Sequence, residues 1–112
     1  MKIIDKGHKY KLKNLKTKGN QTINFYKDGK INNTKTKKGT SNQEVLRVLI
    51  DRVHFLEEQN HHYLNKKIIY HLRKALVLHE MRHLSRKVDK NVDIENISLG
   101  KDGHFKVIGI QK

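Results

Sequence analysis

The sequence contains no cysteine, proline or tryptophan, and only 6% of its 112 residues are aromatic. Without cysteine it can form neither a disulfide framework nor a thiolate metal site, so we expect a reducing, cytoplasmic setting. No run approaches the roughly 18 consecutive apolar residues of a membrane span, and Met1–Lys6 lack the apolar core of about 7 residues of a secretory signal. We therefore expect one domain, residues 1–112, whose small core favours oligomerisation.

The net charge of +14 is distributed unevenly along the chain. Residues 1–40 hold twelve lysines against two aspartates, whereas residues 89–112 hold equal numbers of acidic and basic groups. All five arginines fall within residues 41–88, namely Arg47, Arg52, Arg73, Arg82 and Arg86. Because the guanidinium group suits bidentate phosphate contacts, this middle segment is the expected anion-binding region.

The first 40 residues predict a small antiparallel β-meander followed by a basic loop. Tyr10–Lys13 and Thr22–Phe25 alternate apolar and polar side chains, as half-buried strands do. Thr17–Gln21 carries Gly19-Asn20 and is typical of a turn, and Asp28-Gly29 is a second turn signal.

Residues 41–88 predict an antiparallel helical hairpin. Ser41-Asn42-Gln43-Glu44 is a capping box, in which the serine and glutamate side chains can satisfy backbone amides at a helix start. The apolar stripe that follows is widened beyond one helix face by Val48, Ile50 and Phe55, which favours more than one packing partner. After a short polar break, a second helix is expected from Asn65 to Lys87.

The tail, residues 89–112, predicts little regular structure apart from a short apolar run at His104–Ile110. This run favours a β-strand, which could add to the N-terminal sheet. The predicted fold class is therefore α+β: an N-terminal antiparallel sheet, a two-helix hairpin, and a tail with a short strand.

One motif suggests metal chemistry. His79-Glu80-Met81-Arg82-His83 satisfies H-E-x-x-H on a predicted helix, where two histidines one turn apart can bind zinc and the glutamate can act as a base. Arg82 places a fixed positive charge between the two ligands, and no third ligand follows at a fixed spacing. A small zinc hydrolase is thus a minor alternative. We expect a protein without catalytic residues, metal or cofactor.

Several segments between residues 6 and 88 together form a recognisable pattern, which is most specific from Gly39 to Arg52. The pattern also includes Lys6–Tyr10, Gln21–Phe25, Asn65, Ile69, Leu72, Ala75-Leu76, Arg82 and Arg86. These segments resemble the phage Thoeris anti-defence sponges, a family whose helical hairpin is shared with the anti-CBASS sponges. The resemblance implies a homo-oligomer, with a hexamer among the expected sizes, acting in the cytoplasm of an infected bacterium. It implies sequestration, without cleavage, of cyclic ADP-ribose isomers and of cyclic oligonucleotides.

The predicted ligand site combines the arginines that match the family pattern with neighbouring residues. Arg52, Arg82 and Arg86 are expected to neutralise the ligand phosphates with help from Lys87, and the tail residues His104 and Phe105 to close over the base. An alternative is that Arg52 pairs with Glu57 or Glu58 and only stabilises the hairpin.

A basic nucleic-acid-binding protein is the main alternative function, because the charge of +14 alone gives weak, salt-sensitive binding. This charge is concentrated in the strand and loop segment instead of on a recognition helix. We therefore rank nucleic-acid binding below cyclic-nucleotide binding. Because no apolar run is long enough for a membrane span, we expect no membrane partner.

Overall fold

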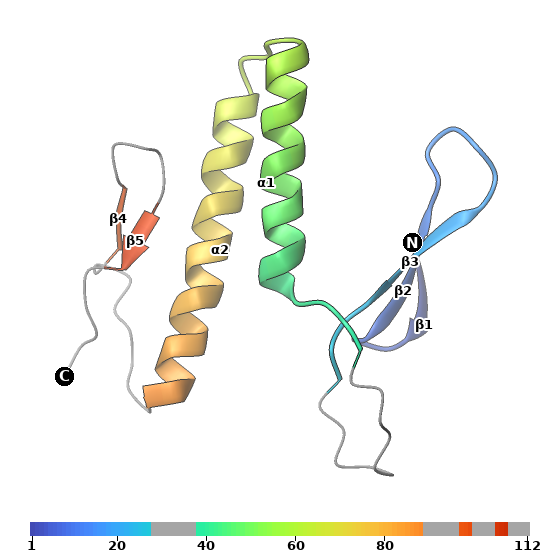
Figure 1. Cartoon of the computed structure of the whole chain (residues 1–112), viewed down its shortest axis with the longest axis horizontal. Coiled ribbons are helices and arrows are strands. Elements are labelled where there is room, and N and C mark those ends of the chain that lie inside the picture. The colour runs from blue at the N-terminus through green and yellow to red at the C-terminus, as the bar shows by residue number, and fades with distance from the viewer. Residues whose placement is uncertain (28–37, 89–96, 100–104, 108–112) are drawn as a thin grey trace. The chain divides into compact units, whose positions relative to one another are not determined.

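A computed structural model describes residues 1–27, 38–88, 97–99 and 105–107, with side chains described to residue 85 (Figure 1). The elements are β1 (Lys2–Asp5), β2 (Lys9–Lys13), β3 (Asn20–Asn24), α1 (Asn42–Gln59), α2 (Asn65–Val88), β4 (Ile97–Leu99) and β5 (Phe105–Val107). This order confirms the predicted α+β class. The chain forms two compact units, Met1–Asn42 and Gln43–Lys112, whose boundary lies close to the predicted end of the basic loop.

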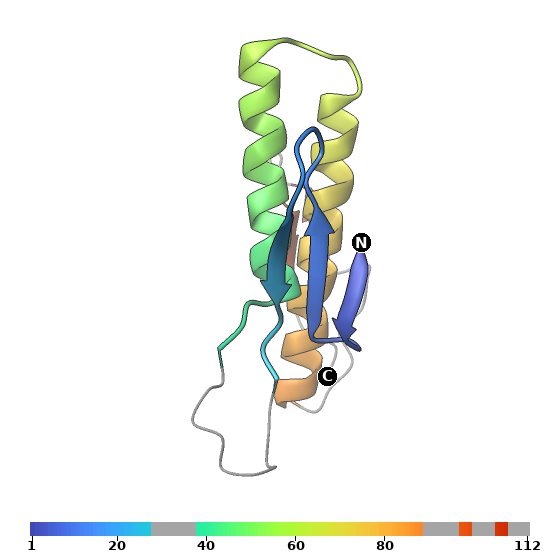
Figure 2. The same cartoon turned by 90° about the vertical axis from the view of Figure 1, so that its right-hand side faces the viewer.

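The first unit is a three-stranded antiparallel sheet in the order β1-β2-β3 (Figure 2). Strand β1 was not predicted, because Ile3 and Ile4 are too short an apolar run to show alternation. The register aligns Ile3, Tyr10 and Ile23 across the three strands, so they share one face. Tyr10 also meets Phe25 edge-on, with ring centroids 5.9 Å apart. Since side chains alternate along a strand, the lysines of β2 occupy the opposite face.

The connection between β2 and β3, residues 14–19, overlaps the turn predicted at residues 17–21, but Asn20 and Gln21 already belong to β3. Gly19 has a φ of 108° there, a left-handed conformation that glycine adopts at little cost. Asn14 closes the turn, because its amide nitrogen bonds the Gly19 carbonyl at 3.2 Å and its side chain donates to the Lys18 carbonyl at 3.1 Å. The Asp28-Gly29 turn lies outside the described residues.

After residue 37 the chain returns to the end of β3. Phe25 and Thr40 form a parallel bridge, in which the Tyr26 amide donates to the Thr40 carbonyl at 2.9 Å and the Thr40 amide to the Asn24 carbonyl at 2.8 Å. A Cβ on Gly39 would lie 2.3 Å from the Tyr26 nitrogen. Only glycine allows the two segments to approach this closely.

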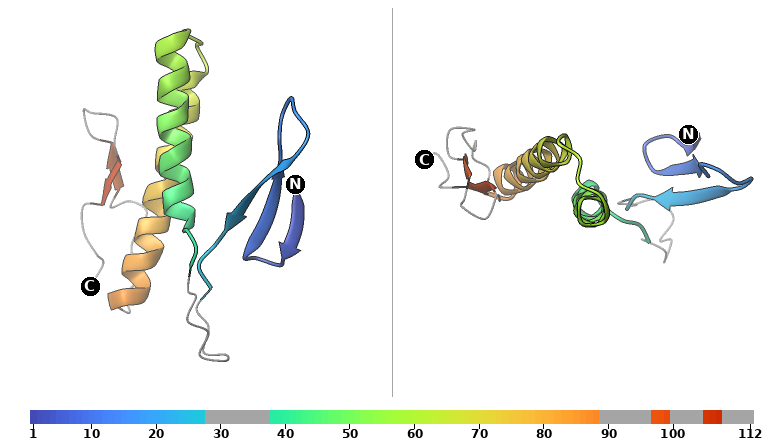
Figure 3. Two further views of the ribbon diagram at one scale, coloured as in Figure 1. Left: turned by 45° about the vertical axis from the view of Figure 1, so that its right-hand side comes forward. Right: turned by 90° about the horizontal axis from the view of Figure 1, so that it is seen from above.

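The second unit is built on two antiparallel helices that lie side by side (Figure 3). Helix α1 begins at Asn42, which places Ser41 at the N-cap as predicted, and α2 ends one residue beyond its predicted end. Ile69, Val77 and Met81 of α2 are buried, whereas α1 has no buried residue. No described helix is long and apolar enough to span a bilayer.

Strands β4 and β5 correct one expectation from the sequence. The predicted C-terminal strand exists at Phe105–Val107, but it pairs with β4 in a separate two-stranded sheet instead of joining β1–β3. Its backbone lies close to α2. The sequence showed an apolar run but not its partner, because Ile97 and Leu99 stand in a mixed polar segment.

The close approach at Gly39 leads to a first prediction. Gly39→Ala should disrupt the bridge to β3, because the added methyl group would overlap backbone atoms that a rotamer change cannot move; we expect a cost of about 1–3 kcal/mol. Amide hydrogen exchange at Tyr26 and Thr40 should accelerate about tenfold or more. Gly7→Ala is the control, because a Cβ at Gly7 has no atom within 4 Å. Unchanged exchange in Gly39→Ala would contradict the account.

Candidate functional site

Two cross-helix contacts define the axial register of α1 and α2, that is, which residues of the two helices lie at the same level along the hairpin. Arg47 Nη2 donates to Glu80 Oε1 at 2.9 Å, and Arg73 Nη2 lies 3.0 Å from His54 Nε2. In an antiparallel pair these contacts place Arg52 level with Ala75. The predicted position of Arg52, opposite the middle of α2, is therefore confirmed.

Arg52 does not form the ion pairs proposed as its structural alternative. Its Cζ lies 5.6 Å from the centroid of the Phe55 ring, one helical turn further on. Glu57 is engaged by the loop after α1, and among residues 1–27 and 38–85 Arg52 has no ion-pair partner. A cation over an exposed ring contributes about 0.5–1 kcal/mol. Among residues 1–27 and 38–85 the N–H donors of the Arg52 guanidinium form no hydrogen bond, so they stay available to a ligand.

The residues around Arg52 form an exposed apolar stripe along α1. Val48 is 61% exposed and Phe55 48%, and Leu49 and Leu56 are also exposed. Each of these four positions lies three or four residues from Arg52, so they lie on one face of the helix with it. We call them, with Arg52, the Arg52 face. It differs from the face of Leu46, Ile50 and Val53, which are half-buried.

Arg82 is the other predicted ligand residue whose side chain is described, and one chain does not bring it to the level of Arg52. Arg82 is exposed on α2 and level with Val45, seven residues from the level of Arg52, or about 10 Å along the helix axis. Arg86 and Lys87 belong to the last turn of α2, and Phe105 begins β5, but their side chains lie outside the described part of the chain. His104 lies outside the described residues altogether. The contributions of these four residues stay predictions.

The H-E-x-x-H motif lies in α2 as predicted, but its glutamate is already engaged. Glu80 accepts the hydrogen bond from Arg47, which itself also contacts Glu44 at 3.3 Å. His79 is half-buried and His83 is exposed. Across the described residues, no three histidine, aspartate or glutamate side chains are grouped closely enough to hold a metal ion. The ion pair with Arg47 would have to break before Glu80 could serve as a general base.

A polar groove of about 410 Å³ runs between the helices on the side of these contacts. It is lined by Arg47, Ile50, Asp51, His54, Arg73 and Leu76. Arginine and acidic side chains are both present, so the groove carries mixed charge. The sequence pattern did not predict it, because cross-helix partners depend on the level at which the helices pair.

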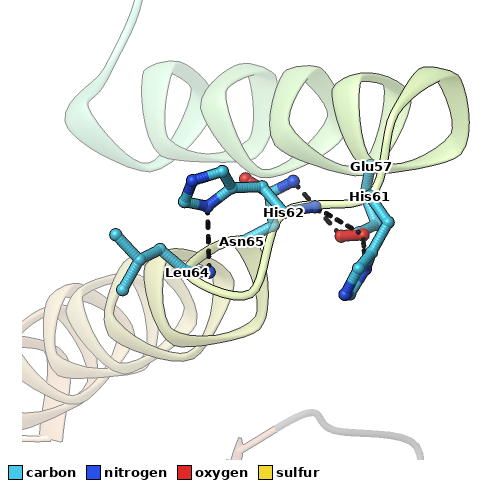
Figure 4. A network of polar contacts seen from close by, with 5 residues as sticks. All are labelled: Glu57, His61, His62, Leu64 and Asn65. Carbon is cyan, nitrogen blue, oxygen red and sulfur yellow. Dashed lines mark hydrogen bonds and ion pairs between the residues drawn. The ribbon is translucent and has the colours of Figure 1, made fainter.

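The loop between the helices is organised by the carboxylate of Glu57 (Figure 4). Its Oε1 accepts hydrogen bonds from His61 Nδ1 and, at 3.3 Å, from the His62 amide, and its Oε2 accepts one from the Asn65 side chain at 3.2 Å. The His62 ring in turn accepts from the Leu64 amide at 3.1 Å. Three residues of the connection and the first residue of α2 are thereby tied to the last turn of α1. The i, i+4 spacing of Glu57 and His61 was the one sequence signal for this network.

These contacts shift the pKa of Glu57. Partial burial raises the pKa of this carboxyl, but the hydrogen bonds from Asn65 and His61, the charge of His61 and the His62 amide outweigh burial and hold the pKa below its ordinary value of 4.5. The hydrogen bonds and the charge of His61 stabilise the ionised carboxylate, whereas burial destabilises it.

Comparison with protein-family models, with curated proteins and with solved structures gives no match for this chain.

The lowered pKa of Glu57 generates a second prediction. Because the folded pKa lies below the unfolded one, the contribution of Glu57 to stability is complete above pH 4.5 and is lost as the pH falls through the folded pKa. The melting temperature of the wild-type protein should fall on acidification below pH 4.5 by more than that of Glu57→Gln. Glu58→Gln removes the same charge one residue away and should keep the wild-type pH dependence. Thermal unfolding followed by circular dichroism across this pH range checks the prediction, and identical profiles for the two variants would contradict it.

Proposed function

We propose that this protein binds cyclic nucleotide immune signals, of the class of cyclic ADP-ribose isomers, and sequesters them without cleavage. The observation that carries the proposal is the Arg52 face, where an exposed guanidinium lies over an exposed phenyl ring within an apolar stripe. Such a ligand carries phosphates and a base. The free N–H donors of Arg52 suit a phosphate, and Phe55 with its apolar neighbours suits the base.

The resemblance supports the same assignment, because its most specific block, Gly39–Arg52, ends at this arginine. In this proposal the protein is a phage anti-defence protein acting in the cytoplasm of the infected host. Cyclic oligonucleotides are a second ligand class of the same chemistry.

Assembly is part of the proposal, because one chain does not bring Arg82 to the level of Arg52. A second copy placed on the Arg52 face would cover the exposed apolar residues and could bring its own basic groups to the ligand. The expected assembly is a homo-oligomer, with a hexamer among the expected sizes.

Sequestration is tested by recovery of the ligand. The purified protein is mixed with a cyclic ADP-ribose isomer, passed over a desalting column, and heated to unfold it. The proposal expects the protein fraction to release the intact isomer, identified by mass spectrometry. A protein fraction that carries no nucleotide, or that releases a linear product, would overturn the proposal.

The third prediction assigns the phosphate contact to Arg52. A charge-assisted contact contributes about 1.5–3 kcal/mol, so Arg52→Ala should weaken binding about tenfold or more while the melting temperature changes little. Arg52→Lys should recover only part of the affinity, since lysine retains the charge but lacks the planar fork. Binding is measured by isothermal titration calorimetry with the same isomer.

Arg47→Ala is the matched control for Arg52→Ala. It also removes an arginine from α1, but one that pairs with Glu44 and Glu80. It should lower stability by about 0.2–1 kcal/mol, the range of exposed ion pairs, and leave affinity unchanged. If Arg52→Ala lowers stability and keeps the affinity, Arg52 is a scaffold residue and the assignment is wrong.

The fourth prediction concerns assembly. Sedimentation velocity at micromolar concentration should give the mass of an assembly of two or more chains, each of 13.2 kDa. Val48→Lys should reduce this mass, because it places a charge in the middle of the apolar stripe. Leu78→Lys, at an exposed apolar position of α2, is the control. A wild-type species at the mass of one chain would contradict the prediction.

A further inference from the structure

One face of the β1–β3 sheet gathers lysines. Lys9, Lys11 and Lys13 alternate along β2 and therefore share a face, with same-face residues about 6.8 Å apart. Lys2 of β1 is the direct cross-strand partner of Lys11. Together with Lys18 of the turn, Lys2, Lys11 and Lys13 line a surface groove of about 400 Å³ whose other lining residues include Thr17, Gly19 and Asn20. We call Lys2, Lys11, Lys13 and Lys18 the lysine face.

Among the described residues, no acidic side chain neutralises the positive charge of the lysine face. Within residues 1–27 there are eight lysines and one acidic residue, Asp5, which pairs with Lys27 at 3.5 Å. None of the four groove lysines has a hydrogen-bond or ion-pair partner for its side-chain ammonium group among the described residues. Like charges directly opposite each other across strands destabilise a sheet, so the pairing of Lys2 with Lys11 has an energetic cost in the free protein. An anion in the groove would remove this cost.

We propose that the lysine face binds the phosphate backbone of a nucleic acid. A row of ammonium groups along β2, joined by Lys2 and Lys18, matches a linear array of phosphates better than a compact ligand with two. The polar groups at Thr17 and Asn20 are suited to further phosphate or sugar contacts. The aromatic rings Tyr10 and Phe25 lie on the opposite face, so the groove lacks a stacking platform for bases. Binding is therefore independent of the base sequence of the nucleic acid and weakens as the salt concentration rises.

The lysine face belongs to the first unit and shares no residue with the Arg52 face of the second unit, so the inference does not rest on the proposed sequestration. Arg52→Ala should leave binding to the lysine face unchanged. The two proposals can consequently fail independently.

The test is the salt dependence of binding to a fluorescein-labelled DNA duplex of mixed sequence and to a labelled single strand. With about four phosphates neutralised, the logarithm of the binding constant should fall with the logarithm of salt concentration at a slope of roughly −3 to −4 on the duplex. Lys11→Gln should reduce the size of that slope by about 1 on either probe. Lys66→Gln removes the same charge from α2, outside the lysine face, and should leave the slope unchanged.

Lys2→Glu separates binding from folding. It converts the like-charge pair with Lys11 into an opposite-charge pair, so the melting temperature should rise while DNA binding weakens about tenfold or more. A general loss of structure cannot produce these opposite changes.

Three results would overturn the proposal. The first is equal loss of affinity in Lys11→Gln and Lys66→Gln, which would mean that only net charge matters. The second is no measurable binding to either DNA at low salt. The third is binding to phosphatidylglycerol vesicles that is stronger than binding to DNA and depends on the same lysines, which would assign the lysine face to an anionic membrane surface.

Discussion

The arrangement of the helical unit depends on how the chain reverses direction after α1. Glu57, in the last turns of that helix, accepts hydrogen bonds from three residues of the reversal and of the start of α2. This carboxylate fixes where α2 begins relative to α1. The level of every later pair along the hairpin follows from it, including Arg47 with Glu80 and Arg73 with His54. With these arginines directed to partners on α2, Arg52 is left on a different face, over Phe55.

The sequence was most informative where a local rule determines the structure. Ser41 and Glu44 located the start of α1 to within one residue, because capping involves only neighbouring residues. A turn was also predicted at Gly19, although Asn20 and Gln21 belong to β3. Pairing between distant segments was harder to predict. Strand β1 was missed, and the partner of β5 was wrong, because strand pairing depends on contacts that short apolar runs do not specify.

The same division holds for the candidate site. Arginine at position 52 could be selected from the sequence, and its i, i+3 spacing to Phe55 is a signal that could have suggested their contact. The partners of Arg47 and Arg73 could not be predicted, since they depend on the level at which the helices pair. That level explains why Arg52 and Arg82 are about 10 Å apart along the helix axis, and why the proposed site needs more than one chain.

The two units present different chemistry to an anion. The sheet carries lysines, which are flexible point charges and suit a repeating phosphate backbone, whereas the helix carries an arginine over an aromatic ring, which suits one phosphate beside a base. The central claim is that the helix holds the cyclic signal. Chemical-shift mapping of the protein amides during titration with a cyclic ADP-ribose isomer tests it directly. The account predicts that the largest shifts fall at Val48–Leu56 of α1, and largest shifts along β2, or none at all, would contradict it.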